Sequence, residues 1–372
     1  MKYRSVAELK EKDQLSLQGR TLYDAGEGTL YCNWTCSGFT IRFRGTCLIA
    51  DMTAWAGEEV ERDLITYKLK KRLNWPCISV FLDGAEEPCR RFKPDREAGR
   101  ELIFQSAETE EHEIRIVKLT ENLKTEAGWK GFYYDGEFLE PEITQRKRIE
   151  FLGDSITCGF GNETDDKDRG YYSEEQNGWK SYAALTGRKL KMDYSLICSS
   201  GICLSRRKYW LHQYAIEELY EYCDRCHEDR VSRGREGAVL TKWDFEKHPS
   251  DYIVINLGTN DANAIMNAPD EAKEEALYHQ QYLDFLKTVR RYNPKAQIIC
   301  TLGSMDYYLY HHITEIVEEY RQETADRKIS CLRLPKMYYL DPAGACSHPH
   351  VTTHEKMAQA LAQYIEKLEL QE

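Results

Sequence analysis

The stretch RIEFLGDSITCG, residues 148–159, decides how the second half of this chain folds. It begins as a short apolar run, typical of a buried strand, that leads directly into Gly153-Asp154-Ser155. Ser155 is therefore expected on the first turn beyond the carboxyl end of a strand, where open α/β sheets bind ligands. A serine hydroxyl is a weak nucleophile unless a base removes its proton. The same chain must therefore also supply a base and a set of oxyanion donors.

Three later segments contain candidates for these roles. An apolar run over 192–197 leads into CSSG, which places Gly201 where a backbone N–H can approach a ligand closely. A second run over 252–257 leads into GTND, so the side-chain amide of Asn260 is expected at the same edge of the sheet. Near the C-terminus, His348 precedes the last predicted helix. The four blocks in this order, each of the first three after a strand, resemble the SGNH or GDSL-type hydrolases.

The resemblance and the chemistry of ester hydrolysis assign roles to these residues. Ser155 is the predicted nucleophile and His348 the predicted base. The predicted oxyanion donors are the backbone N–H groups of Ser155 and Gly201 and the side-chain amide of Asn260. The other common α/β serine hydrolases carry Gly-x-Ser-x-Gly, but Thr157 stands where the second glycine belongs. The resemblance implies that no cofactor is needed, and no metal is expected.

Three histidines near the C-terminus compete for the role of base. His354 falls inside or at the start of the last helix and is interpreted as a packing residue, whereas His350 falls on a loop beyond His348. SGNH enzymes commonly carry Asp three residues before the histidine, where this chain has Ala345. Some members of the family that this chain resembles use a Ser-His dyad in which a backbone carbonyl holds the imidazole in its tautomer, and the same arrangement is predicted here. A distant Asp341 stays open as the alternative third member.

Composition bounds the number of domains and the kinds of partner. A chain of 372 residues exceeds what one core usually organises, so two domains are expected, at 1–142 and 143–372. The net charge is −11 and no basic run is interleaved with aromatics, so neither nucleic acid nor a membrane is expected as a partner. The N-terminus lacks the apolar segment of a signal peptide, which favours a soluble, cytoplasmic protein.

The cysteines favour the same compartment. Thirteen is an odd number and they are scattered, which indicates reduced thiols more than a disulfide framework. The run CDRCH at 223–227 suggests zinc, but a second Cys/His pair at ligand spacing is absent. Cys223 and Cys226 are therefore interpreted as a pair of helix cysteines.

From about residue 15 to residue 141 the pattern is β. Phe39, Ile41 and Phe43 alternate with polar residues at the strand period of two. Similar short runs cover 29–34, 47–52, 77–82, 102–105 and 114–119. Many short strands with no convincing helix predict an all-β sandwich, a jelly roll. This domain could serve as a packing module, bind sugars, or lend a loop to an active site.

Beyond a short charged connection at 140–148, strands and helices alternate. This alternation predicts a parallel sheet covered on both faces, a three-layer α/β/α domain. The predicted strands cover 149–152, 192–197, 252–257, 297–302 and 329–334, and the predicted helices cover 179–190, 209–226, 271–292, 312–326 and 353–368. The stretch 205–248 is longer and more charged than a crossover needs and is interpreted as an insertion near the site.

The resemblance extends beyond the four blocks. A β-sandwich of this size precedes GDSITCG, NLGTND and a closing pattern of His348-Pro349, His354 and Met357-Ala358. This combination is similar to carbohydrate esterase family 2. The family implies removal of O-acetyl groups from hemicellulose, xylan and mannan among its forms, or from derived oligosaccharides. An acetylated oligo- or polysaccharide is thus the expected partner.

Two other functions use the same residues. In an acetyltransferase, an acetyl-Ser155 intermediate would pass its group to a sugar hydroxyl instead of water. In a carbohydrate-binding protein the site would be inactive, which the joint presence of nucleophile, base and amide disfavours. Among the aromatic residues of this half, Tyr209, Trp210 and Tyr307 are the best placed to stack on a sugar ring.

Overall fold

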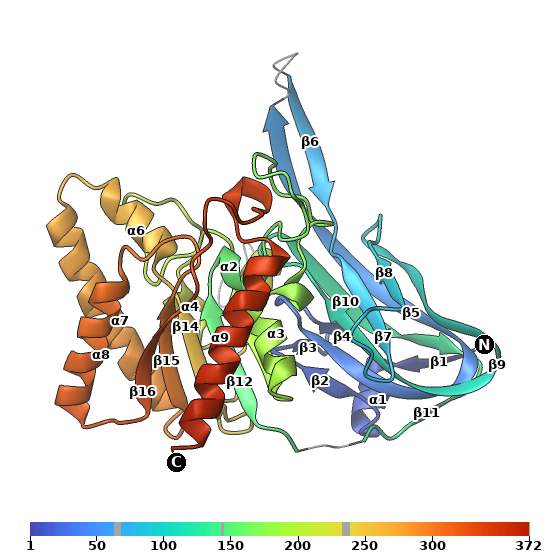
Figure 1. The fold of residues 1–372 in the computed structure, drawn as a ribbon. Helices are drawn as coiled ribbons and strands as arrows, with labels where there is room; N and C mark the ends of the chain where they lie inside the picture. The colour runs from blue at the N-terminus through green and yellow to red at the C-terminus, as the bar shows by residue number, and fades with distance from the viewer. Residues whose placement is uncertain (63–67, 143–144, 233–238, 372) are drawn as a thin grey trace. The chain divides into compact units, whose positions relative to one another are not determined.

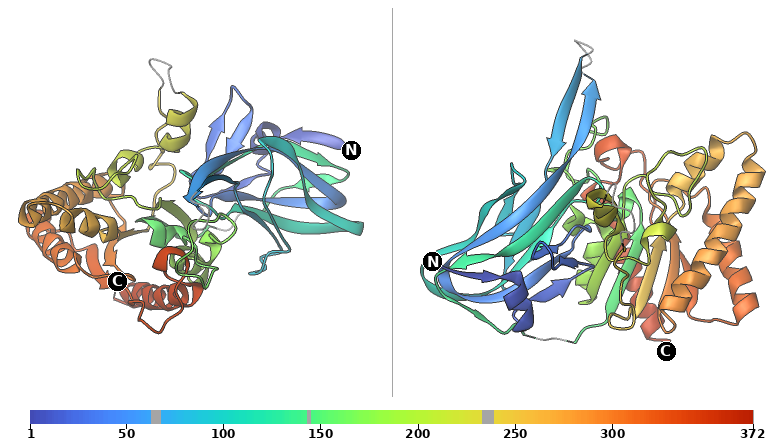
Figure 2. Two further views of the ribbon diagram at one scale, coloured as in Figure 1. Left: turned by 90° about the horizontal axis from the view of Figure 1, so that it is seen from above. Right: turned by 180° about the vertical axis from the view of Figure 1, so that it is seen from behind.

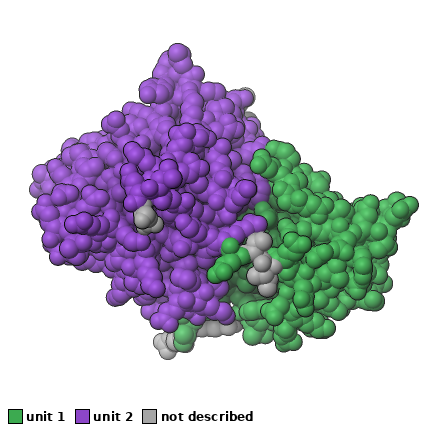
Figure 3. Space-filling model, turned by 60° about the horizontal axis from the view of Figure 1, so that its bottom comes forward, with its two compact units in different colours: residues 1–145, 171–174, 223–241 green, residues 146–170, 175–222, 242–372 purple. Residues whose placement is uncertain are grey.

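The computed structural model describes residues 1–62, 68–142, 145–232 and 239–371, drawn as ribbons in Figures 1 and 2. The chain divides into two compact units, coloured in Figure 3. Unit 1 comprises residues 1–145, 171–174 and 223–241, and unit 2 comprises residues 146–170, 175–222 and 242–372. The predicted boundary between 142 and 143 stays a prediction, because 143–144 lie outside the described residues. No described helix combines the length and apolar character needed to cross a membrane.

Unit 1 is an antiparallel all-β domain, and this prediction is confirmed. Its strands are β1 (Lys2–Ser5), β2 (Ser16–Gln18), β3 (Leu22–Asp24), β4 (Thr29–Tyr31), β5 (Gly38–Arg62), β6 (Leu69–Asn74), β7 (Ile78–Leu82), β8 (Arg90–Phe92), β9 (Ala98–Lys118), β10 (Thr125–Tyr134) and β11 (Glu137–Leu139). The sheet order is β3-β4-β10-β5-β9-β7-β8, with further strands paired to β5 and β10. Phe39, Ile41 and Phe43 are fully buried in its core, as their alternation predicts.

Two strands of unit 1 are far longer than the sequence pattern predicts. β5 runs for 25 residues and β9 for 21, where the pattern predicts separate short strands. Their pairing shifts register between Gly45 and Cys47 and again between Leu48 and Ile49. Bulges of this kind bend and twist a strand without ending it. The prediction of short separate strands was therefore wrong, because these irregularities are not turns.

The helix α1 (Val6–Glu11) was also not predicted. The Ser5 hydroxyl accepts a hydrogen bond from the backbone N–H of Glu8, and the Glu8 carboxylate accepts one from the backbone N–H of Ser5. This reciprocal pair is a capping box, whose Ser-x-x-Glu pattern is readable in the sequence. Val6 and Leu9 then bury the apolar side of the helix in unit 1.

Part of the predicted insertion belongs to unit 1. Residues 223–241 join the sandwich through the helix α5 (Arg225–Val231). Asn33 donates a hydrogen bond to the buried carboxylate of Asp224 at 2.7 Å. Glu126 of β10 and Nδ1 of His227 are 2.8 Å apart, and both side chains are buried. Polar groups withdrawn from water need such partners, so these bonds fix the segment in place.

The predicted helix over 209–226 was wrong. Before α5, only α4 (Ile216–Leu219) is helical in this stretch. Asp224 caps α5, so Cys226 lies inside a helix whereas Cys223 precedes it. Upstream of α4, the ring nitrogens of His212 contact two backbone carbonyl oxygens at 2.6 and 3.1 Å. Such side-chain bonds compete with helical ones, and the periodicity of the sequence does not reveal them.

Unit 2 is a three-layer α/β/α domain, as predicted. Its elements are β12 (Arg148–Gly153), α2 (Ser155–Cys158), η1 (Gly178–Lys180), α3 (Tyr182–Lys189), β13 (Asp193–Cys198), α4, β14 (Tyr252–Asn256), α6 (Thr259–Met266), α7 (Glu271–Tyr292), β15 (Gln297–Leu302), α8 (Tyr310–Thr324), β16 (Ile329–Arg333), η2 (Ala345–Ser347) and α9 (Val351–Glu369). The five strands are parallel in the order β13-β12-β14-β15-β16. α3 and α9 cover one face of the sheet, and α7 and α8 cover the other (Figure 1). The helices α2 and α6 and the short η2 were not predicted.

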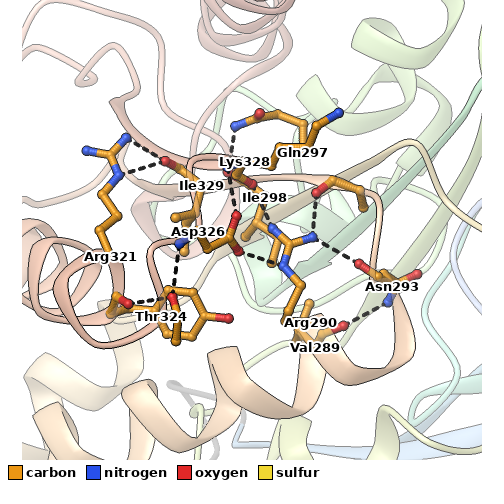
Figure 4. A network of polar contacts seen from close by, with 12 residues as sticks. Val289, Arg290, Asn293, Gln297, Ile298, Arg321, Thr324, Asp326, Lys328 and Ile329 are labelled. Carbon is orange, nitrogen blue, oxygen red and sulfur yellow. Dashed lines mark hydrogen bonds and ion pairs between the residues drawn. The ribbon is translucent and has the colours of Figure 1, made fainter.

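Arg290, near the end of α7, joins two loops at the amino end of the sheet, the one that precedes β15 and the one that precedes β16 (Figure 4). Its Nε donates to the carboxylate of Asp326 at 2.7 Å. Its Nη atoms donate to the carbonyl oxygens of Asn293 at 3.0 Å and Lys328 at 2.8 Å. Arg290 and Asp326 are both largely buried. If the guanidinium were removed, water could therefore not easily take its place as a hydrogen-bond donor.

We expect Arg290→Met to lower the free energy of unfolding of unit 2 by about 2–3 kcal/mol, because it removes the charged partner of a largely buried carboxylate and a donor from each of the carbonyl oxygens. Urea titration followed by circular dichroism measures the change. Arg291→Met is the matched control, since the Arg291 side chain is 64% exposed and its contact with Glu221 is 3.3 Å long. An exposed pair of this kind contributes under about 1 kcal/mol. Equal losses in the two variants would contradict the role assigned to Arg290.

Candidate active site

The turn after β12 places Ser155 at the carboxyl edge of the parallel sheet. Gly153 ends the strand, and Asp154 caps α2 by accepting a hydrogen bond from the N–H of Ile156 at 2.9 Å. A Cβ at Gly153 would meet Oγ1 of Thr157 at 2.0 Å, so only glycine permits this tight approach. Ser155 is the first residue of α2 and is 7% exposed.

His348 is hydrogen bonded to Ser155. Nε2 of His348 lies 2.8 Å from Oγ of Ser155, and Nδ1 lies 3.0 Å from the carbonyl oxygen of Ala345. Because a carbonyl oxygen can only accept, Nδ1 carries the proton and Nε2 is left as the acceptor for the serine hydroxyl. The ring also packs on Phe160, with the centroids 4.5 Å apart.

The loop before His348 has an uncommon backbone. Cys346 and Ser347 have φ values of 50° and 58°. These values lie in the left-handed region of backbone conformation, which residues other than glycine rarely adopt. Backbone hydrogen bonds hold them there: the N–H of Cys346 donates to the oxygen of Arg169, and that of Ser347 to the oxygen of Lys167, both at 3.0 Å. This tight turn brings the preceding carbonyl under the imidazole.

The other candidates for base or third member lie elsewhere. His354 is fully buried, accepts a hydrogen bond from the N–H of Tyr182 at 3.1 Å, and has its pKa lowered by burial to about 3. It is a packing residue, as interpreted. His350 caps α9. Asp341 is hydrogen bonded to Lys356 at 2.7 Å, and no contact joins it to His348 in the described structure.

Gly201 and Asn260 follow the two strands that flank β12. Gly153 pairs with Cys198 on β13 and with Asn256 on β14, so the three strands end at the same level. Gly201 has a φ of 81°, which favours glycine. Nδ2 of Asn260 donates to the carbonyl oxygen of the residue after Gly201 at 2.9 Å. An amide nitrogen carries two hydrogens, so one remains for a ligand.

Asp261, the residue after Asn260, was not singled out in the sequence. Its buried carboxylate accepts hydrogen bonds from the N–H of Leu204 at 3.1 Å and from Nε of Arg207 at 3.0 Å. Arg207 is itself buried. Asp261 therefore fastens the loop that contains Gly201 to the start of α6. The adjacent Asn-Asp pair was the available signal, because a buried carboxylate needs a partner.

Asp154, beside the serine, is fully buried, and burial raises its pKa to about 7 from 3.8. The folded protein thus holds a proton that the unfolded chain releases near pH 4. The stabilisation from this proton is complete below about pH 4 and is lost as the pH rises through about 7. The hydrogen bond from Ile156 opposes the rise.

We expect Asp154→Asn, which keeps an oxygen to cap α2, to remove this dependence on pH. Between pH 5 and pH 8 the wild type should lose about 2–3 kcal/mol of unfolding free energy relative to the variant. Urea titrations of both proteins at the two pH values provide the measurement. If the difference in unfolding free energy between the two proteins were the same at both pH values, Asp154 would be ionised throughout this range.

The aromatic candidates for sugar contact have different surroundings. Nε1 of Trp210 donates to the carbonyl oxygen of Gly201 at 2.7 Å, so this partly buried ring is held beside the site. Tyr209 precedes it and is also partly buried. The hydroxyl of Tyr307 donates to the oxygen of Leu334 at 2.5 Å, on the loop after β16. Of these three candidates, Trp210 is the one with a hydrogen bond to a predicted site residue.

The fold and this geometry together define a class. A parallel α/β/α domain with a serine hydrogen bonded to an imidazole at the carboxyl edge of its sheet is a serine-dependent hydrolase. The chain belongs to the GDSL-like lipase/acylhydrolase family, whose model matches residues 151–361. A carbohydrate esterase 2 N-terminal model matches residues 17–141. The resemblance to SGNH hydrolases with a family 2 N-terminal domain is thereby confirmed.

Comparisons with individual relatives support this family assignment. The chain is 28% identical over 336 residues to the cellulase/esterase CelE of Acetivibrio thermocellus, covering 89% of this chain and 36% of the relative. It is 27% identical over 274 residues to an acetylxylan esterase / glucomannan deacetylase of Cellvibrio japonicus, covering 69% of each. A solved family two carbohydrate esterase from Clostridium thermocellum, in complex with cellohexaose, has a TM-score of 0.79, 25% identity and coverage of 95% and 98%. This chain thus spans about a third of CelE.

Proposed function

We propose that this protein is a carbohydrate O-acetyl esterase that works through an acetyl-serine intermediate. The proposal rests on two consecutive hydrogen bonds. One joins Oγ of Ser155 to Nε2 of His348 at 2.8 Å, and the other joins Nδ1 of His348 to the carbonyl oxygen of Ala345 at 3.0 Å. The carbonyl takes the orienting role that a carboxylate has in a triad, so the pair acts as a dyad. The match to the esterase 2 N-terminal model supports a carbohydrate ester.

The proposed reaction has two halves. Oγ of Ser155 bonds to the acetyl carbon while its proton moves to Nε2 of His348. The tetrahedral intermediate then breaks its bond to the sugar oxygen, which leaves with that proton. In the second half, a water molecule gives a proton to His348 and attacks the acetyl carbon. Acetate departs as the proton returns to Ser155.

Negative charge on the carbonyl oxygen needs donors in both halves. We assign this role to the backbone N–H groups of Ser155 and Gly201 and to the amide of Asn260. Asn260 is 7% exposed, and donors withdrawn from water act more strongly than solvated ones. Its hydrogen bond to the carbonyl oxygen of Ile202 joins it to the loop that contains Gly201. Preorganisation of this kind is what lowers the barrier.

The proposed substrate is acetylated mannan or xylan, or oligosaccharides derived from them. The names of the relatives support this choice, since one acts on acetylxylan and glucomannan. We further propose a cytoplasmic location, where short oligosaccharides would be the substrate. None of the thirteen cysteines forms a disulfide in the described structure, which is compatible with a reducing compartment. Fractionating the native cells and locating the protein outside the cytoplasm would remove that part of the proposal.

The direct test treats acetylated mannan and acetylated xylan with the protein and with Ser155→Ala. Released acetate is measured, and NMR identifies the acetyl positions that survive. We expect acetate from at least one polymer with the parent protein and none above background with the variant. Glycan binding by both proteins without acetate release by the parent would instead indicate a binding protein. Acetyl groups appearing on added unacetylated mannan would indicate a transferase.

Asp341→Asn should leave kcat for an acetyl ester within about threefold of the parent value. The reason is geometric, because Asp341 contacts Lys356 and the backbone N–H of Tyr338, both outside the proposed dyad. Steady-state kinetics with an activated acetyl ester provide the measurement. A fall of several orders of magnitude would show that a carboxylate, and not the carbonyl, orients the histidine.

A further inference from the structure

A second cluster of ligand-type side chains lies between α7 and α8, which pack side by side (Figures 1 and 2). Glu275 and His279 are one helical turn apart on α7. His312, Glu315 and Glu319 follow the i, i+3, i+7 spacing on α8, which puts them on one face of that helix. The two helices thus present two imidazoles and three carboxylates toward a common strip.

The donor atoms of this cluster are close together. Among the described residues, His279, His312 and Glu315 each offer a ligand atom, and the three atoms lie within 4.8 Å of one another. A tetrahedral zinc ion places its ligand atoms about 3.4 Å apart. The Glu315 side chain is 64% exposed, so it can rotate to close the remaining gap. The arrangement therefore needs side-chain adjustment but no movement of either helix.

His312 has an unused ligand position. Its Nε2 is buried, and it forms no hydrogen bond within the described structure, the carboxylate of Glu275 being 3.7 Å away. A buried polar atom without a partner is uncommon and calls for an explanation. An imidazole nitrogen with a free lone pair is a common metal ligand.

Two carboxylates complete the surroundings. Glu319 is hydrogen bonded to Nε2 of His279 at 2.7 Å, and carboxylates in this position orient metal-bound imidazoles. Glu275 is held by the hydroxyl of Tyr308 at 3.0 Å. The strip therefore has three acidic groups around two imidazoles, which favours a cation over any other occupant.

We propose that His279, His312 and Glu315 bind one divalent transition-metal ion, with zinc the best match to two imidazoles and a carboxylate. This ligand set is typical of zinc, and a water molecule would take the fourth position. The sequence predicts no metal, because its ligands come from two separate helices and show no local Cys/His spacing. The proposed ion joins α7 to α8 by binding side chains from both helices, and it has no part in ester hydrolysis.

Zinc titration of the chelator-treated protein by calorimetry tests this proposal. We expect one equivalent of saturable binding, and His279→Ala and His312→Ala should each weaken it at least about tenfold. His311→Ala and Glu318→Gln are the matched controls on α8, since they change a histidine and a carboxylate outside the ligand set. Free thiols can also bind zinc. The double variant His279→Ala/His312→Ala, which keeps every cysteine, measures that background.

Two further readouts make the outcome decisive. A zinc concentration about 100 times the dissociation constant should raise the unfolding temperature by roughly 5 °C in the parent and not in the double variant. Cobalt in place of zinc should give a spectrum without a sulfur charge-transfer band. Equal zinc binding by the parent and the double variant, or a cobalt spectrum dominated by sulfur, would overturn the proposal. So would the absence of saturable binding to the parent.

Discussion

Ser155→Ala and His348→Ala should each lower kcat for hydrolysis of an acetyl ester by roughly 10⁴- to 10⁶-fold. The hydroxyl and the imidazole are joined by a single 2.8 Å hydrogen bond and act as one unit. For this reason the double variant should be no slower than the worse of the two single variants. Strong non-additivity of this kind is a property of groups that share one step.

The matched control for this prediction is His350→Asn. Asparagine is a good helix cap, so the start of α9 is preserved while a neighbouring imidazole is removed. We expect its kcat to stay within a few fold of the parent value. If His350→Asn and His348→Ala lost similar activity, the assignment of the base would be wrong. If the two single losses multiplied in the double variant, serine and histidine would act in independent steps.

The second large effect is expected at the oxyanion site. Asn260→Ala should lower kcat by about 10²- to 10³-fold with little change in KM, because the donor acts on charge that grows only in the transition state. The amide also holds the Gly201 loop, through the carbonyl oxygen of Ile202. Asn260→Asp is therefore tested beside it, since it keeps the shape and removes the donor.

Asn263→Ala provides the control on the same helix. Its amide donates to the carbonyl oxygen of Thr259 at 3.0 Å, one turn away, and has no role in the proposed reaction. Kinetics with an activated acetyl ester should show a loss for both Asn260 variants and near-parent rates for Asn263→Ala. Equal KM increases with unchanged kcat in the Asn260 variants would mean that the amide binds substrate without stabilising the transition state.

The sequence predicts the framework of unit 2 well because that framework is local. The strand before Ser155 and the long helix α7 have strong apolar periodicity and clear ends, and α7 begins and ends at the predicted residues, 271 and 292. The choice among the three histidines also needed only local information. His354 lies on the buried face of the last predicted helix, and the structure places it in the core.

Features that depend on distant contacts could not be predicted in this way. The segment 223–241 belongs to unit 1 because Asp224 and His227 have partners about a hundred or more positions away, in the sandwich. The long strands β5 and β9 continue through bulges that resemble turns in sequence. The carbonyl of Ala345 is invisible as a candidate, since every residue has one. Only the left-handed turn at Cys346 and Ser347 directs it to the imidazole.

In the proposed reaction, Ser155 carries the acetyl group between the two halves. Peptide mapping by mass spectrometry, after rapid acid quenching of the enzyme with excess activated acetyl ester, detects this intermediate. We expect an acetyl group on the peptide that contains Ser155, lost again with time and absent from Ser155→Ala. Full turnover with that peptide unmodified at every quenching time, or with acetyl on another side chain, would contradict it.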